Sequence, residues 1–204
     1  EGDALGCAIC KQAHADGARV VLLPTLPYGT QTNMRSLPLA MNLYPSTLTL
    51  IISNLLETIV QSGIRKVLLL NMHGGNEMKS VVRELSPRTD ASLFICNFWE
   101  VLGDDYDDIF ENPEDHAGEL ETSMYLYLAE EDVRKDKIKS GTTTLNDEKS
   151  PFVYTDLFGH GPAALTSWTS SYSETGVLGD AEKGTKEKGQ RVYNEAVKQL
   201  CIFV

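Results

Sequence analysis

Several common signatures of function are missing from this sequence of 204 residues. No apolar run reaches the roughly 18 residues that a membrane-spanning helix needs, and no signal-peptide pattern is visible. There is no GxSxG nucleophile turn, and Gly74 and Gly75 lack the spacing and the following Lys-Ser/Thr of a phosphate loop. We therefore expect no membrane partner, and we find no signature of a serine hydrolase or a nucleotide-binding enzyme. The cytoplasm is the default location.

Cysteine and basic residues are also scarce. Cys7 and Cys10 form a CxxC within an apolar helical run, and no second CxxC completes a zinc site, so buried helix thiols are favoured. Lys and Arg number 18 against 29 Asp and Glu, a net charge of -11. This charge argues against nucleic acid and anionic membranes as partners. It suits binding of divalent cations, although a solvated acidic surface is the commoner explanation.

Helix and strand patterns alternate along the chain. The apolar periodicity and the turn residues predict strands over 18–24, 66–71 and 91–97, and helices over 3–16, 76–85, 118–129 and 180–200. A further helix follows Pro45, with Ser46 or Thr47 as N-cap and Gly63 as its end. We expect an α/β fold in which residues 1–204 form a single domain, with a mostly parallel sheet and helices on both faces.

Two polar clusters lie where regular elements should end or begin. Asn71-Met-His-Gly-Gly-Asn76 follows a predicted strand, and His116-Ala-Gly-Glu-Leu-Glu-Thr122 opens a predicted helix. Ligands of parallel sheets bind at the carboxyl ends of the strands, where the 28–33 loop should also lie. Imidazole and carboxylate groups gathered there are the ligand chemistry of a hydrolytic metal site.

Each cluster also has a simpler explanation. His73 can be a histidine that hydrogen-bonds the backbone of a strand-to-helix turn, with Asn76 capping the next helix. The carboxylates after His116 can merely complement the helix dipole, although this accounts poorly for the histidine. The motifs taken one at a time leave these alternatives open.

Taken together, the motifs resemble the creatininase (creatinine amidohydrolase) family. The resemblance rests on Asn-x-His-Gly-Gly-Asn, His-Ala-Gly-Glu-x-Glu-Thr-Ser, Ser173-x-Thr-Gly-Val-x-Gly-Asp180 with Lys183-Gly184, Leu26-Pro-Tyr-Gly-Thr-Gln31 and Pro45-Ser-Thr47. It implies a metal-dependent hydrolase that cuts a C–N bond of a small, linear or cyclic amide with metal-activated water. It further implies two divalent metals per site (zinc, manganese or iron) and a homo-oligomer, often a hexamer.

The resemblance also implies roles for individual residues. Asp3 resembles the carboxylate that bridges both metals, His73 a metal ligand, and Glu119 the carboxylate ligand of the second metal and part of the catalytic set. His116 resembles the residue that shuttles a proton or orients the substrate. The expected pocket-lining residues are Tyr28, Gln31 and Asn76.

The sequence departs from the family pattern in three places. No Glu-x-His segment precedes Asp3, so we expect an N-terminally incomplete domain that lacks two metal ligands. Gly75 stands where creatininase carries a carboxylate, and Gln31 where many members have a serine. The alternative to an enzyme is a non-catalytic member of the fold that acts as a small-molecule binder or an assembly subunit.

Overall fold

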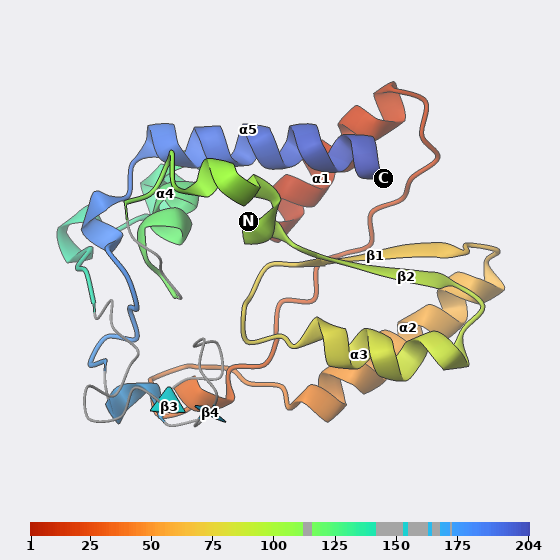
Figure 1. Ribbon diagram of the computed structural model, residues 1–204, viewed down its shortest axis with the longest axis horizontal. Helices are drawn as coiled ribbons and strands as arrows, with labels where there is room; N and C mark the ends of the chain where they lie inside the picture. The colour runs from red at the N-terminus through yellow and green to blue at the C-terminus, as the bar shows by residue number, and fades with distance from the viewer. Residues whose placement is uncertain (112–115, 142–152, 155–162, 165–167, 172) are drawn as a thin grey trace. The chain divides into compact units, whose positions relative to one another are not determined.

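The computed structural model describes residues 1–111, 116–141, 153–154, 163–164, 168–171 and 173–204 (Figure 1). The chain divides into two compact units. We name residues 2–32, 41–101 and 196–204 the sheet unit, and residues 1, 33–40 and 102–195 the α4 unit. The regular elements are α1 (Gly2–Ala15), α2 (Pro45–Gln61), β1 (Lys66–Asn71), α3 (Met78–Leu85), β2 (Ser92–Asn97), α4 (Glu119–Leu128), β3 (Val153–Tyr154), β4 (Ala163–Ala164) and α5 (Lys186–Phe203), with short 3₁₀ turns between them.

The sheet unit is built on a parallel pair of strands. β1 and β2 run in register, from Lys66 opposite Ser92 to Asn71 opposite Asn97. The helices α2 and α3 cover one face, where Val67, Leu69 and Leu93 pack against a core of buried helix residues (Figure 1): Leu48, Ile52, Leu56, Val81 and Leu85. On β2, Phe94 meets the ring of Phe203 edge to face, with ring centroids 5.6 Å apart. The predicted parallel strands with apolar cover are therefore present.

The strand predicted over residues 18–24 is wrong. These residues have no regular structure, and Val21, Leu22 and Leu23 are 64%, 44% and 45% exposed. Leu22 does pack against α1: the close approach is seen at Gly6, where an added Cβ would lie 2.9 Å from Leu22 Cδ1. A strand needs a hydrogen-bonded neighbour, and within the described part of the chain β1 pairs only with β2. Apolar composition alone could not supply that neighbour.

Two predicted N-caps are also wrong. α2 begins at Pro45 with Tyr44 as N-cap, so Ser46 and Thr47 lie inside the first turn. Proline suits this first position because its missing N–H needs no partner there. α3 has Glu77 as N-cap rather than Asn76, whose side chain bonds elsewhere.

The α4 unit contains α4 and the first part of α5. α4 covers Glu119–Leu128, close to the predicted 118–129. α5 begins six residues later than predicted, because Ala181–Lys183 forms a separate 3₁₀ turn and the chain is extended at Gly184.

The short strands β3 and β4 pair in parallel. Most of the polar stretch between residues 142 and 167 lies outside the described residues. Among the described helices, none has the length and apolarity to cross a membrane.

Glu130 joins the residues after α4 to α5 through two ion pairs. Its carboxylate accepts hydrogen bonds from Lys135 and, at 2.7 Å, from Lys186. These bonds lower the pKa of Glu130 from 4.5 to about 2. A lowered pKa stabilises the fold above pH 4.5, and this contribution disappears as the pH falls through 2. We expect carboxyl NMR titration to give a pKa near 2 for Glu130, and a clearly higher value in Lys186→Gln. A Glu130 pKa that stays near 2 in Lys186→Gln would contradict this pairing.

Candidate active site

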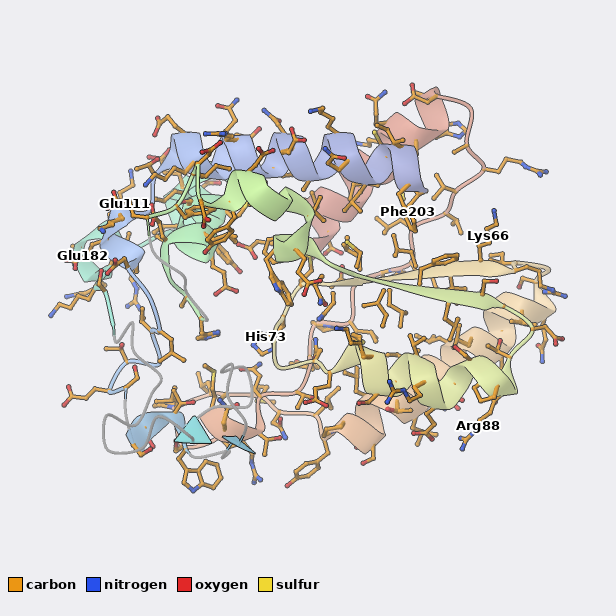
Figure 2. The ribbon with its side chains drawn as sticks, viewed as in Figure 1. Lys66, His73, Arg88, Glu111, Glu182 and Phe203 are labelled. Atoms are coloured by element: carbon orange, nitrogen blue, oxygen red, sulfur yellow. The ribbon has the colours of Figure 1, made fainter. Side chains whose placement is uncertain are left out.

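A buried amide network fixes the loop that carries His73, at the carboxyl end of β1 (Figure 2). Asn71 is 1% exposed, and its Nδ2 donates to Asn97 Oδ1 at 2.9 Å and to the Asn76 carbonyl at 3.3 Å. Its Oδ1 accepts from the His73 backbone N–H at 3.3 Å and from Asn76 Nδ2 at 3.1 Å. One buried side chain thus ties both strand ends to the backbone of His73.

The 28–31 loop packs against the His73 loop, as the sequence predicts. The Thr30 N–H donates to Asn76 Oδ1 at 2.8 Å, and a Cβ on Gly75 would lie 2.2 Å from the Thr30 carbonyl oxygen. The Gln31 N–H donates to Asn42 Oδ1 at 2.7 Å. Tyr28 is 51% exposed. The amide of Asn76 is engaged at both its oxygen and its nitrogen, so this residue holds the two loops together.

Asp3 lies in the first turn of α1, and this end of the helix lies close to the His73 loop. A Cβ on Gly2 would lie 3.4 Å from Met72 Cγ and 3.4 Å from the Thr25 side chain. Thr25 Oγ1 donates to Asp3 Oδ1 at 2.5 Å, which orients the carboxylate. The sheet unit therefore brings the Asp3 end of α1 against the residue that precedes His73.

In the α4 unit, His116 is fixed by backbone pairing with Leu178. The His116 N–H donates to the Leu178 carbonyl at 3.2 Å, and the Leu178 N–H donates back at 2.7 Å. The His116 Nδ1 lies 4.0 Å from Glu121 Oε2, which also accepts from the Ala117 N–H. Burial lowers the pKa of His116 below 6.5, so the ring is neutral at physiological pH.

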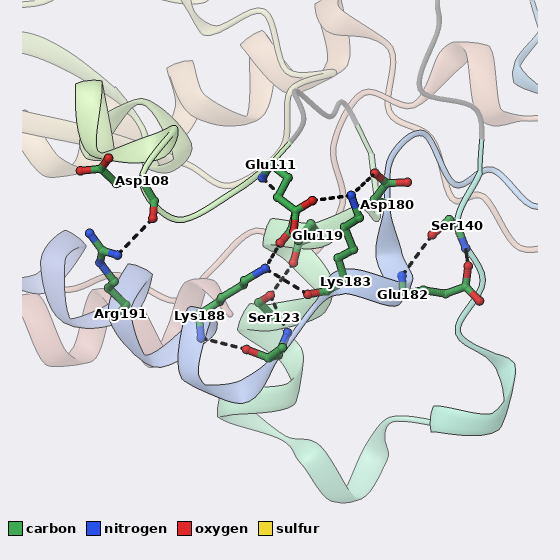
Figure 3. A network of polar contacts seen from close by, with 11 residues as sticks. Asp108, Glu111, Glu119, Ser123, Ser140, Asp180, Glu182, Lys183, Lys188 and Arg191 are labelled. Atoms are coloured by element: carbon green, nitrogen blue, oxygen red, sulfur yellow. Dashed lines mark hydrogen bonds and ion pairs between the residues drawn. The ribbon is translucent and has the colours of Figure 1, made fainter.

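Glu119 does not share this environment. Its side chain is 1% exposed and forms an ion pair with Lys188 of α5, while its Oε2 accepts from the Glu111 N–H at 3.4 Å (Figure 3). Glu121 is 28% exposed. Its charge also acts on Glu1, which belongs to the same unit: burial and, second to it, the negative charge of Glu121 raise the pKa of Glu1 to about 7. The carboxylate beside His116 is therefore Glu121, and the role of Glu119 as a metal ligand stays a prediction.

These residues include side chains that suit a metal ion, but they do not form a complete set of metal ligands. Within the described residues, no group of three or more His, Cys, Asp or Glu side chains is placed to hold a metal ion. Asp3 and His73 provide a carboxylate and an imidazole in the sheet unit, which suit zinc, manganese or iron. Structural zinc sites use four protein ligands and catalytic ones three, so two donors bind a metal weakly.

Sequence reasoning missed several residues that shape these clusters. Asn71 and Asn97 end their strands at matching positions, and the repeated apolar-run-then-Asn pattern was an available signal. Glu121 was visible inside the His116 motif but was not preferred. Lys188 carried no local signal, because its partner Glu119 lies in a distant part of the sequence.

Comparison with protein families and curated sequences gives consistent relatives. A family model described as creatininase, creatinine amidohydrolase, matches residues 3–204. The creatinine amidohydrolase of Pseudomonas putida is 24% identical over 97% of this chain and 78% of its own length. The mycofactocin precursor peptide peptidase of Mycobacterium tuberculosis (strain CDC 1551 / Oshkosh) is 28% identical over 68% of this chain. The match spans 47% of that peptidase, about half its length.

Solved structures share the fold. A protein from Bacteroides fragilis NCTC 9343, described as a candidate creatinine amidohydrolase, superposes with a TM-score of 0.82 at 25% identity, over 98% of this chain and 79% of its own. Creatininase superposes with a TM-score of 0.73 at 22% identity, over 98% and 80%. Related structures are described as a manganese creatininase and as a mutant of Zn-Zn type. The predicted creatininase-like α/β fold, a parallel sheet with helices, is confirmed. The chain belongs to the creatininase (creatinine amidohydrolase) family.

Proposed function

We propose that the protein is a metal-dependent amidohydrolase that cleaves a C–N bond in a small linear or cyclic amide. The observation that carries this proposal is in the sheet unit, where the Asp3 end of α1 lies against Met72, next to His73. The two residues come from separate elements: the Asp3 carboxylate accepts from Thr25 Oγ1, and the backbone N–H of His73 donates to Asn71 Oδ1. Carboxylate and imidazole groups on adjoining segments are typical of hydrolytic metal sites.

Asp3 and His73 are the metal ligands in this proposal, and a stable centre with two metals needs further ligands beyond them. A bound divalent metal would supply an activated water and polarise the scissile carbonyl. Glu119 was the carboxylate ligand expected from the sequence, but its contact with Lys188 occupies it. In the α4 unit we assign Glu121 as the carboxylate that pairs with His116.

His116 serves as the proton-transfer residue. Its neutral ring can accept a proton and deliver it to the departing nitrogen, because burial keeps the pKa of His116 low. Glu121, 4.0 Å from Nδ1, would stabilise the protonated ring and hold its orientation. Tyr28 and Gln31 are the proposed substrate contacts. Assembly as a homo-oligomer, a hexamer by resemblance, stays a prediction.

Metal analysis of the purified protein tests the ligand proposal. We expect the wild type to bind zinc, manganese or iron, and Asp3→Asn and His73→Ala to lose most of the metal. His14→Ala is the matched control, because the His14 side chain is exposed and its Nδ1 lies 3.4 Å from the Ala18 carbonyl oxygen at the end of α1. Equal metal content in His73→Ala and His14→Ala would overturn the ligand assignment.

Activity is then measured on a panel of linear and cyclic amides, including short peptides. The wild type should hydrolyse at least one of them, and His116→Ala should lower kcat while metal content is kept. A wild type that binds no metal and hydrolyses no amide would instead support a non-catalytic binder on the same fold.

A further inference from the structure

We infer that the buried Glu119–Lys188 ion pair is a positioning device for the site, which sets the rotation of α4 and thereby the placement of His116 and Glu121. The inference rests on the proposed function for its catalytic consequence. It replaces the role expected for Glu119 from the sequence and adds Lys188, which lies outside the motifs.

The first argument is the one-sided environment of Glu119. Its carboxylate is 1% exposed, and both oxygens are engaged inside the α4 unit, one by Lys188 and the other by the Glu111 N–H (Figure 3). Lys188 is 26% exposed and also donates to the Lys183 carbonyl at 3.3 Å. A buried carboxylate that left this pair would lose its compensating charge, so Glu119 is held on the α5 side of α4.

The second argument is the close approach of the two helices beside this pair. Ser123 is fully buried; its hydroxyl donates to the Glu119 carbonyl at 2.6 Å and accepts from the Thr185 N–H at 3.0 Å. A Cβ on Gly189 would lie only 1.9 Å from the Ser123 carbonyl oxygen. The backbones of α4 and α5 therefore touch at this point. Rotation of α4 about its own axis is restricted there.

The third argument is the position of Glu119 and Glu121 on the same turn of α4. Glu121 follows Glu119 by two positions, which places its side chain about 200° further around the helix. With Glu119 fixed towards α5, Glu121 is directed away from α5 and caps the Ala117 N–H beside His116. Ala117 has a φ of 51°, a backbone conformation that a non-glycine residue rarely adopts without constraint from its surroundings. By holding Glu119 on the α5 side of α4, the ion pair thus sets the side of the helix on which Glu121 meets His116.

The alternative role for Glu119 is that of a metal ligand, and the two roles predict different partners. A metal ligand would act independently of Lys188. A positioning residue would act only through Lys188, so that removing both members is no worse than removing one. Removing one member of a buried ion pair leaves the other charge uncompensated, whereas removing both does not, which makes the double variant informative.

The experiment uses the full-length protein and the variants Glu119→Gln, Lys188→Met and the double variant Glu119→Gln/Lys188→Met. We expect each single variant to lower kcat by about 10-fold to 100-fold with metal retained, as is typical for residues that orient a site. The double variant should match the worse single variant. Lys188→Arg should keep kcat near the wild-type value, because the guanidinium keeps the positive charge and can donate to the Glu119 carboxylate.

Lys183→Met is the matched control, since Lys183 pairs with Glu111 and Asp180 in the same network but is 39% exposed. Its kcat should stay within about twofold of wild type, because exposed pairs contribute little. The ring NMR signals of His116, one of only four histidines, should shift in Lys188→Met and stay unchanged in Lys183→Met. Unchanged His116 signals in Lys188→Met would overturn the inference.

Metal content separates the remaining outcomes. Loss of metal in Glu119→Gln but not in Lys188→Met would restore Glu119 as a ligand and overturn the positioning role. If the wild type hydrolyses no amide, the proposed function fails by itself. The coupling between Glu119 and Lys188 in thermal unfolding and in the His116 signals then still decides whether the pair sets the turn.

Discussion

Gly75→Ala is expected to lower the free energy of unfolding by about 2–3 kcal/mol, because the new methyl group would overlap fixed backbone. Its Cβ would lie 2.2 Å from the Thr30 carbonyl oxygen and 2.7 Å from His73 Cε1. Thr30 cannot retreat easily, since its N–H is bonded to Asn76 Oδ1. Thermal unfolding should show a melting temperature lower by roughly 5–10 °C for a chain of this size.

Gly74→Ala is the control for this prediction. A Cβ on Gly74 would meet no atom within 4 Å. The added methyl should therefore leave stability unchanged or raise it by up to about 1 kcal/mol through the unfolded chain. In Gly75→Ala the His73 ring must also move, so metal binding should weaken along with stability. Equal melting temperatures for the two variants would show that the 28–31 loop does not pack on Gly75.

The contrast between these glycines marks what the sequence could predict. Two glycines after His73 indicated a tight turn with close backbone approach, and this is found at Gly75. The sequence could not say which glycine makes the contact, because the contacting atom belongs to Thr30, far away in the chain. Local signals predicted β1, the end of α1 and the extent of α4 well, since apolar periodicity and capping glycines are local properties.

The errors arise where the deciding partner is distant in sequence. The apolar run from residue 18 to 24 resembles a strand, but strand formation depends on a neighbour that periodicity does not reveal. Asn76 resembles an N-cap, yet its amide is bound by Thr30 and Asn71. The metal-ligand role expected for Glu119 stays a prediction. Its distant partner Lys188, on another helix, distinguishes this buried carboxylate from Glu121, which lies beside His116.

Asn71→Ala is expected to lower the free energy of unfolding by about 3 kcal/mol, since buried hydrogen-bonding groups would be left unpaired. Asn71 is 1% exposed and makes four hydrogen bonds, to Asn97, to the His73 N–H and twice to Asn76. The loss should appear as a melting temperature lower by roughly 6–12 °C. Asn54→Ala, on the exposed side of α2, is the control and should change stability by less than about 0.5 kcal/mol.

Asn71→Asp separates the hydrogen bonds from the size of the side chain. The carboxylate keeps the shape and can still accept from His73 and Asn76, but it cannot donate to the Asn97 and Asn76 oxygens. A buried charge facing two oxygens is unfavourable, so this variant should be at least as unstable as Asn71→Ala at neutral pH. Burial raises the pKa of such a carboxyl group, and protonation restores one donor. The loss of unfolding free energy in Asn71→Asp relative to the wild type should therefore shrink as the pH falls. A variant as stable as Asn54→Ala at every pH would show that the amide network does not hold the His73 loop.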